Sequence, residues 1–240
     1  MELDSFRIKF REKLEKINIQ IDDIKIQQFY EYMNLLIEWN KKINLTAITE
    51  PEDIILKHFI DSLTISKYVN GKEKIADIGT GAGFPGIPIK IINPNVEMFL
   101  IDSLNKRIKF LEEVITRENL KNVYAIHARA EEIGHNKEYR EKFDIVTSRA
   151  VARLNVLLEY MMPLLKIGGK CICLKGPNAE DELHEAKNAL EILGGKIEKV
   201  EEIVLPDSDN KRKIIVIEAV KHFDKKYPRK AGVPTVSPLW

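Results

Sequence analysis

The chain has 240 residues, of which 44% are hydrophobic and 31% charged, and its formal net charge is +1. This balance is typical of a soluble globular protein, and no low-complexity segment or internal repeat interrupts it. No apolar run reaches the roughly 18 residues of a membrane span, and the amino terminus MELDSFRIKF lacks a signal-peptide pattern. We therefore expect a cytoplasmic protein with no membrane partner. We also expect it to act as a monomer.

The cysteines and histidines argue against a disulfide framework and against a metal site. Cys171 and Cys173 lie two apart on an expected strand, so their side chains share one face. We expect them to pack in the core of a protein from a reducing compartment. The five histidines are scattered without ligand spacing, so no metal is expected.

Positive charge is concentrated near the carboxyl end. Residues 211–230 contain eight Lys or Arg against two acidic residues, a net of +6, whereas residues 1–70 have 10 against 12, a net of −2. A basic segment on a nearly neutral chain is typical of a protein with an anionic partner, and an ordinary solvated surface explains it equally well.

Residues 1–70 are expected to form a helical segment packed on the rest of the chain. Phe29, Met33, Leu36 and Ile37 recur at helical spacing. The stretch from Thr49 to Glu52 has the pattern of a capping box with a proline in the first turn, which predicts a helix from about 50 to 68.

After residue 73 the pattern changes to alternating strands and helices. Strands are expected at 74–78, 96–102, 122–128, 143–148 and 170–174, and helices at 106–118, 154–165 and 179–193. Two last strands, near 196–205 and 213–220, have no helix between them and are expected to pair antiparallel. Successive strand–helix units predict an α/β fold with a doubly wound, mostly parallel sheet over residues 71–222. Residues 223–240 are expected to be a basic tail that contains prolines.

The stretch DIGTGAGFPGIPIK, residues 77–90, is the expected ligand site. In an open α/β sheet, ligands bind beyond the carboxyl ends of the strands, and glycines there let the backbone approach the ligand closely. We expect Gly79, Gly81 and Gly83 to contact a cofactor, with Asp102 at the end of the second strand accepting hydrogen bonds from two ribose hydroxyls.

The type of nucleoside depends on Asp77. The loop satisfies the G-x-G-x-x-G pattern of NAD enzymes, but a carboxylate in the mouth of the loop would repel a diphosphate. It would attract the sulfonium and ammonium groups of S-adenosylmethionine, which we expect to be the cofactor. Asp77 can also be interpreted as a turn residue that caps the loop backbone.

Several motifs together resemble the bacterial 16S rRNA guanine-N7 methyltransferases, the family also called glucose-inhibited division protein B. They are NLTAITEPEDIILKHFIDSL, DIGTGAGFPGIPI, IDSLNKRIKFL, SRAVARL, CLKGPN and the tail RKAGVPTVSPL. The resemblance implies a seven-stranded class I methyltransferase fold, S-adenosylmethionine as cofactor, and methylation of a guanine N7 in a loop of 16S rRNA. The partner would be 16S rRNA, the small ribosomal subunit or an assembly intermediate.

The resemblance also implies roles for particular residues. Cofactor contacts map onto Gly79, Phe84, Ala130, Glu131 and Arg149, with Ala130 and Glu131 against the adenine. Contacts to the RNA map onto Lys106, Arg107, Arg129, Arg149 and Arg212. From the residues themselves we add Asn44, Lys175, Arg229 and Lys230 on the RNA side; a turn role for Asn44 and a solvated Lys175 are the alternatives.

Arg149 is the residue expected to matter most for turnover. It ends the fourth strand, where the pocket should open toward substrate, and its guanidinium could hold the cofactor carboxylate, a phosphate or guanine O6. His58 and Asp61 share one helix face and are expected either to pack two segments or to line the site. Three other functions stay open: a methyltransferase for a small molecule or protein, an NAD-binding redox protein, and a non-catalytic RNA-binding module.

Overall fold

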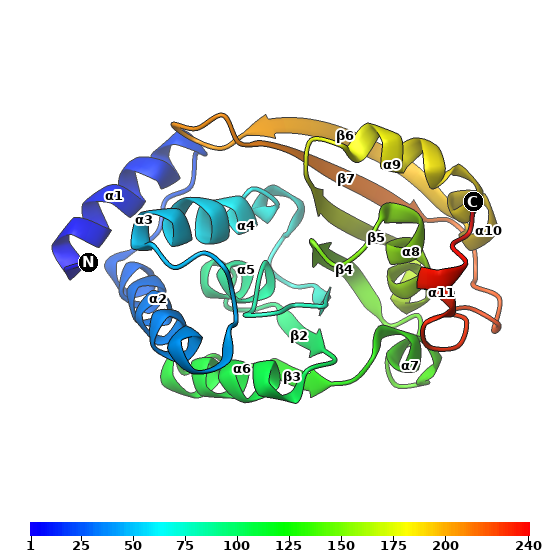
Figure 1. Ribbon diagram of the computed structural model, residues 1–240, viewed down its shortest axis with the longest axis horizontal. Coiled ribbons are helices and arrows are strands. Elements are labelled where there is room, and N and C mark those ends of the chain that lie inside the picture. The colour runs from blue at the N-terminus through cyan, green and yellow to red at the C-terminus, as the bar shows by residue number, and fades with distance from the viewer.

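A seven-stranded sheet with the order β3-β2-β1-β4-β5-β7-β6 runs through the computed structural model, which describes residues 1–240 (Figure 1). The strands are β1 (Lys74–Ile78), β2 (Glu97–Asp102), β3 (Val123–His127), β4 (Phe143–Arg149), β5 (Leu165–Lys175), β6 (Gly195–Val204) and β7 (Lys211–Ala219). The first five strands are parallel, and β7 pairs antiparallel with both β5 and β6. The expected doubly wound α/β fold is confirmed, and the strand order reverses at β1, which lies between β2 and β4.

Helices cover both faces of the sheet (Figure 1). One layer contains α1 (Leu3–Lys16), α2 (Asp23–Ile43), α3 (Pro51–Ile54), the π-helical turn Ile55–Ile60, α4 (Asp61–Leu63), α5 (Gly86–Ile92) and α6 (Asn105–Arg117). The other contains α7 (Ala130–His135), α8 (Leu154–Met161), α9 (Ala179–Glu185), α10 (Lys187–Leu193) and the short α11 (Val233–Val236).

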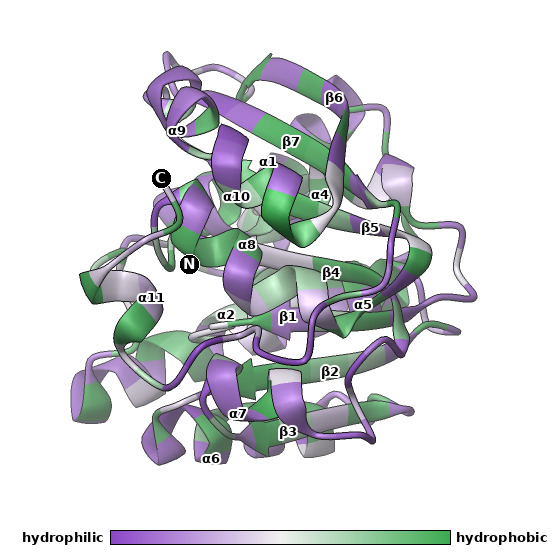
Figure 2. Cartoon of the chain, turned by 90° about the vertical axis from the view of Figure 1, so that its right-hand side faces the viewer, coloured by the Kyte–Doolittle hydropathy of each residue, from purple (hydrophilic) through white to green (hydrophobic).

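Two hydrophobic clusters, one on each face, hold these layers to the sheet. Alternate strand residues belong to different clusters: Ile75 packs with the amino-terminal helices, whereas Ala76 packs with α8. This is the two-residue period of a strand that is buried on both faces. Figure 2 shows the result, with hydrophobic colour along the central strands and hydrophilic colour on much of α9 and α10.

The amino-terminal helices share the core of the sheet. Four phenylalanines are fully buried there: Phe6, Phe10, Phe29 and Phe59. The ring centroids of neighbouring members of this group are 4.8–6.5 Å apart. Because burial of an aromatic side chain stabilises by roughly 1.5–3 kcal/mol, this cluster fixes the helices to the sheet. It positions the loop between α2 and α3 over the carboxyl ends of the strands.

Some local expectations were wrong. Helix α3 begins at Pro51 with Glu50 as N-cap, and no side chain makes a capping hydrogen bond there, so the capping box from Thr49 to Glu52 does not form. The expected helix 179–193 is two helices, α9 and α10, divided at Ala186. Strand β5 begins at Leu165 rather than at 170 because Leu165 pairs with Phe143 ahead of the irregularity in that ladder.

The cysteines lie where the sequence placed them. Cys171 and Cys173 are both fully buried on β5, with their sulfur atoms 3.6 Å apart, and both are free thiols. No helix is long and apolar enough to span a bilayer.

Candidate functional site

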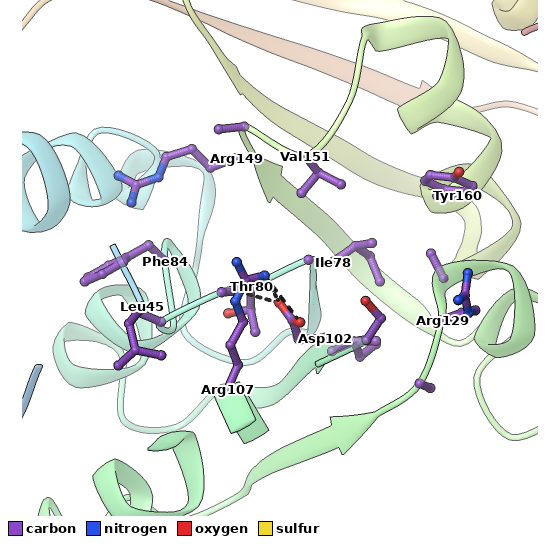
Figure 3. A pocket seen from close by; sticks show the side chains of 18 of the residues that line it. Leu45, Ile78, Thr80, Phe84, Asp102, Arg107, Arg129, Arg149, Val151 and Tyr160 are labelled. Atoms are coloured by element: carbon purple, nitrogen blue, oxygen red, sulfur yellow. Dashed lines mark hydrogen bonds and ion pairs between the residues drawn. The ribbon is translucent and has the colours of Figure 1, made fainter. Parts of the chain in front are cut away.

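A cavity of about 600 Å³ opens at the carboxyl ends of β1, β2, β3 and β4. Figure 3 shows Asp102 near its middle, with Leu45, Phe84 and Arg149 on one side and Arg129 and Tyr160 on the other. It lies at the switch point where strand order reverses, as ligand sites in open α/β sheets do. We call it the first cavity.

The glycine loop after β1 forms part of the floor. Gly79 and Gly81 have φ of +66° and +63°, a left-handed conformation that L side chains rarely adopt, and both line the cavity. A Cβ on Gly79 would overlap the side chain of Val151, whereas one on Gly81 would meet only the carbonyl oxygen of Gly79, at 4.0 Å. Gly81 therefore leaves open space for a ligand.

Gly83 does not line the cavity, contrary to expectation. Its φ is +99°, and an added Cβ would lie 2.7 Å from both the Tyr32 hydroxyl and a carbon of Ile87. Tyr32, fully buried in α2, donates its hydroxyl to the carbonyl of Ala82. Gly83 is thus required for packing the loop on α2.

Asp77 caps the glycine loop from beneath and does not stand in its mouth. Its Oδ2 accepts hydrogen bonds from the Thr80 hydroxyl at 2.7 Å and from the Gly86 N–H at 2.8 Å. The side chain is fully buried, Oδ1 has no partner, and Asp77 is not among the residues that line the cavity. Burial raises the pKa of this carboxyl from 3.8 to about 6. The turn interpretation of Asp77 therefore fits the structure.

Asp102 lines the cavity, and its oxygens are already engaged. Oδ1 accepts from Leu104 N–H and Oδ2 from Gly81 N–H, both at 2.9 Å. Arg107 reaches the same carboxylate, with Nη1 3.1 Å from Oδ2. This side chain was expected to contact RNA, but α6 directs it into the first cavity (Figure 3).

The carboxyl end of β3 and the start of α7 form one side of the cavity. Arg129, Ala130 and Glu131 line it, and Glu131 is 8% exposed. Three further lining residues come from distant segments: Tyr160 of α8, and Gly232 and Thr235 near the carboxyl terminus. None of these three was singled out as a site residue, although Gly232 and Thr235 lie in the tail motif RKAGVPTVSPL, because only folding brings the tail across α8.

The opposite side contains a stack of three groups. The His58 ring lies on Phe84, with centroids 4.3 Å apart and planes within 12°, and the Arg149 guanidinium lies 5.1 Å from the Phe84 centroid. Arg149 Nη2 donates to His58 Nδ1 at 2.9 Å, and Nη1 donates to the Lys57 carbonyl at 3.0 Å. Of its five N–H donors, the Nε one and one on Nη2 have no protein partner.

Asp61 holds Arg149 from below. Its Oδ2 accepts from Arg149 Nη1 at 2.8 Å and its Oδ1 from Arg212 Nε at 3.0 Å, and the residue is 2% exposed. A buried carboxylate between two guanidiniums orients both and offsets their charge. His58 and Asp61 thus both pack the segments together; His58 lines the first cavity, and Asp61 lines only a second one, described below.

The contact with Arg149 fixes the tautomer of His58. Because an arginine can only donate, Nδ1 must accept, so Nε2 carries the proton and donates to the Thr46 hydroxyl at 2.9 Å. Burial, and then the charge of Arg149, lower the pKa of His58 to about 3. The ring is therefore neutral and has no free nitrogen to accept a substrate proton.

A second cavity of about 610 Å³ adjoins the first. The two share His58, Arg149, Ala150 and Val151, so the end of β4 forms the boundary between them. Charged side chains dominate the remaining walls of the second cavity: Lys57, Asp61, Arg153, Lys175, Glu182 and Arg212.

Several side chains expected to bind RNA are engaged within the protein. Lys175 is 6% exposed and contacts Glu182 at 2.8 Å, and Arg229 forms a two-pronged pair with the buried Glu159. Arg212 is held by Asp61, as described. Each of these three side chains therefore stabilises the fold, because it neutralises a carboxylate that is largely buried.

The other RNA candidates remain at the surface. Arg129 and Lys230 are exposed, and their side-chain nitrogens have no protein partner. Lys106 is exposed and donates to the Ile43 carbonyl. Asn44 ends α2 in the left-handed conformation, with φ +45°, and lines a separate hollow rather than either cavity, so its turn interpretation fits the structure.

The loop before α3 depends on a residue that the sequence did not single out. Asn40 Oδ1 accepts from the N–H groups of Leu45 and Thr46, and its Nδ2 donates to the Thr46 carbonyl. These bonds set Leu45 and Thr46 against the first cavity.

No group of three or more His, Cys, Asp or Glu is arranged to hold a metal.

A family model and full-length relatives of known name match this chain, and they agree on one family. The model of the family described as rRNA small subunit methyltransferase G matches residues 25–215. The chain is 49% identical over 234 residues to ribosomal RNA small subunit methyltransferase G of Lactobacillus johnsonii, covering 96% of this chain and 98% of that one. It is 50% identical over 242 residues to the protein of the same name from Acetivibrio thermocellus, covering 99% and 100%.

Solved structures support the fold alone. TYW2 of M. jannaschii, solved in complex with AdoMet, is 19% identical with a TM-score of 0.53 and covers 67% of this chain and 75% of that chain. Precorrin-6y C5,15-methyltransferase of Geobacter metallireducens is 18% identical with a TM-score of 0.50, covering 66% and 86%. The sheet is that of class I methyltransferases.

Proposed function

The chain belongs to the rRNA small subunit methyltransferase G family, and from this premise we propose that it methylates N7 of a guanine in 16S rRNA. It is an S-adenosylmethionine-dependent methyltransferase of small-subunit ribosomal RNA. One observation carries the assignment of the site: two cavities of similar size meet at the end of β4 and share Arg149. A methyl donor in the first cavity and a nucleotide in the second would meet there.

The first cavity fits the cofactor. S-adenosylmethionine supplies a methyl group on a positively charged sulfur, ready for transfer to a nucleophile. Gly79 and Gly81 would lie along it, and Gly81 leaves the space that a Cβ would fill. Asp102 would hold the ribose, whose hydroxyls would donate to this carboxylate in place of Arg107. Ala130 and Glu131 would contact the adenine, as in the family.

No general base is needed for this reaction. Guanine N7 carries a free lone pair at neutral pH, so no proton has to leave before attack. The site agrees, because both nitrogens of neutral His58 are engaged and Asp77 is sealed beneath the loop. Rate would come from alignment of the reacting atoms, and positioning of this kind can contribute about 7–11 kcal/mol.

Arg149 would orient the base. Its two uncommitted N–H donors lie at the boundary of the cavities, and a donor to guanine O6 would set N7 toward the methyl group. N7 gains positive charge as it is methylated, so a bare cation beside it would oppose the reaction. Asp61, 2.8 Å from Arg149, reduces that opposition.

RNA would reach the site in a loop or an unpaired segment, because the A-form major groove is too narrow to present N7 to a protein. The exposed cations Lys106, Arg129 and Lys230 are proposed to contact phosphates. We propose that the protein acts as a monomer. We also propose that the reaction takes place in the cytoplasm, on 16S rRNA or a small-subunit particle.

The test is methyl transfer by an Arg149 variant. Arg149→Ala and Arg149→Lys should retain the fold and lose most turnover, because lysine lacks the planar fork that spans His58 and Asp61. Arg117→Ala, at an exposed pair on α6, is the control and should be fully active. Tritium from labelled cofactor should enter small-subunit RNA and not a metabolite extract, and mass spectrometry should place it at N7 of guanine.

Near-normal transfer by Arg149→Ala would remove this residue from the site. Label in metabolites alone would support a small-molecule methyltransferase. Thermal stabilisation by NAD and not by S-adenosylhomocysteine would support a redox protein instead.

A further inference from the structure

The carboxyl-terminal segment Phe223–Val236 crosses one side of the first cavity. Its Gly232 and Thr235 line that cavity, although the family model ends at residue 215. In Figure 1 the segment, coloured red, runs from the end of β7 past α7 and α8. It therefore reaches the side of the site that Ala130 and Glu131 occupy.

A buried ion pair fixes this segment to α8. The Arg229 side chain donates to Glu159 through Nε at 2.9 Å and Nη2 at 2.7 Å, and the Arg229 backbone N–H donates to the same carboxylate at 2.7 Å. Glu159 is fully buried. A buried carboxylate without a partner is strongly unfavourable, so the core itself requires Arg229 in this position.

A second anchor joins the segment to α7. The Arg140 guanidinium donates to the backbone carbonyls of Phe223, Asp224 and Tyr227. The Pro228 ring fills the space beside Gly134, where an added Cβ would lie 2.6 Å from Pro228 Cδ. A glycine inside α7 costs helix stability, and this contact is its structural reason.

At α11 and at the residue before it, the segment contacts two side chains of the cavity wall. The Gly232 N–H donates to Glu131 Oε1 at 3.0 Å, and the Thr235 and Tyr160 hydroxyls lie 3.1 Å apart. The Tyr160 hydroxyl also interacts with the Glu131 carboxylate, whose two oxygens together offer about four acceptor positions. A carboxylate oxygen held at the wall in this way can accept from the exocyclic amino group of adenine, which is a donor.

We propose that Phe223–Val236 is a working part of the cofactor site, which positions Glu131 to bind the adenine of an adenosine ligand. The proposal rests on the proposed function, since it takes adenosine as the ligand of the first cavity. Of the basic residues of this segment, Arg229 is the one committed to Glu159, and it holds the segment on α8.

The first test removes the Gly232 N–H. Gly232→Pro deletes the donor to Glu131 and also forces φ away from +84°, because proline fixes φ near −65°. Gly71→Pro is a control with the same backbone strain: Gly71 has φ +90°, open space at Cβ and an N–H that donates to the Glu73 carboxylate, but it lies outside both cavities. Binding of S-adenosylhomocysteine and of 5′-methylthioadenosine, which lacks the amino-acid part, is measured by calorimetry. Gly232→Pro should weaken both about tenfold or more, as expected for a lost hydrogen bond to a charged group, and Gly71→Pro neither.

The second test moves the segment from a distance. Gly134→Ala favours the helix itself but collides with Pro228, so it should also weaken both ligands while leaving α7 intact. In a Glu131→Ala background, Gly232→Pro should add little, because its effect runs through Glu131. Unchanged affinities in Gly232→Pro, fully additive effects in the double variant, or a loss confined to S-adenosylhomocysteine would each overturn the proposal.

These outcomes are separate from the proposed function. If the unmodified protein binds neither ligand, the cofactor assignment fails. If it binds both and the variants match it, only the role of the carboxyl-terminal segment fails.

Discussion

Asp61→Asn should be among the most damaging changes of a single charge in this chain. Asp61 is 2% exposed and is the carboxylate partner of two guanidiniums, Arg149 and Arg212, whose side chains are 14% and 24% exposed. Asparagine has nearly the same shape but no charge, and its amide group would turn a donor toward one arginine. Breaking a buried pair costs about 3–5 kcal/mol because the remaining charge is left without a partner.

Urea denaturation measures this loss. For a slope of about 3 kcal/mol per molar, the unfolding midpoint should fall by about 1–2 M. Glu198→Gln, which breaks the exposed pair with Lys170, is the control and should change stability by about 0–1 kcal/mol. Arg212→Met added to Asp61→Asn should recover part of the loss, since it removes one unpaired charge.

Methyl transfer by Asp61→Asn under conditions where it remains folded should also fall, because Arg149 loses the group that orients it. A midpoint shift no larger than that of Glu198→Gln would refute the reasoning, as would full activity.

Two further predictions concern pH. The pKa of His58 is lowered from 6.5 to about 3. Between these two pH values the unfolded chain binds a proton that the folded chain does not. The stability that this residue contributes is therefore complete above pH 6.5 and is lost as the pH falls toward 3. His58→Gln should show a shallower loss over that range in thermal melts, and an identical slope would contradict this. The pKa of Asp77 is raised from 3.8 to about 6 because burial disfavours the charged carboxylate. Above pH 6 the charge therefore lowers the free energy of unfolding by about 3 kcal/mol, and this cost disappears as the pH falls toward 3.8. Asp77→Asn should be at least as stable at pH 7 and lack that pH dependence; lower stability at pH 7 would show that the charged cap outweighs its desolvation.

The fold could be predicted from local patterns. Each parallel strand is a short apolar run followed by a helix, and the runs at 74–78 and 143–148 agree with β1 and β4 within one residue. The last two strands pair antiparallel, as the absence of a helix between them indicates. These features depend on which face of each segment must be buried, and that information is local.

The expectations for Asp77 and Gly83 were wrong because their positions depend on contacts that local sequence patterns do not show. Asp77 was expected at the mouth of the loop because sequence shows that a carboxylate precedes the glycines but not on which side of the backbone it lies. Thr80 and Gly86 offer two donors beneath the loop, so the carboxylate turns there. Gly83 was assigned to the cofactor because its reason for being glycine, the Tyr32 side chain, is 51 residues away.

The sequence by itself determined the layers, the strand directions and the family, and it located the glycine loop beside which the first cavity opens, because apolar periodicity and contiguous motifs are properties of neighbouring residues. Tertiary structure alone decided which charges are free. Arg229 and Glu159 are 70 positions apart and Arg212 and Asp61 are 151 apart, and each pair forms only when distant elements pack and exclude water between them. A count of basic residues predicts only an anionic partner or a solvated surface, whereas burial next to a carboxylate shows that Arg212 and Arg229 pair within the protein.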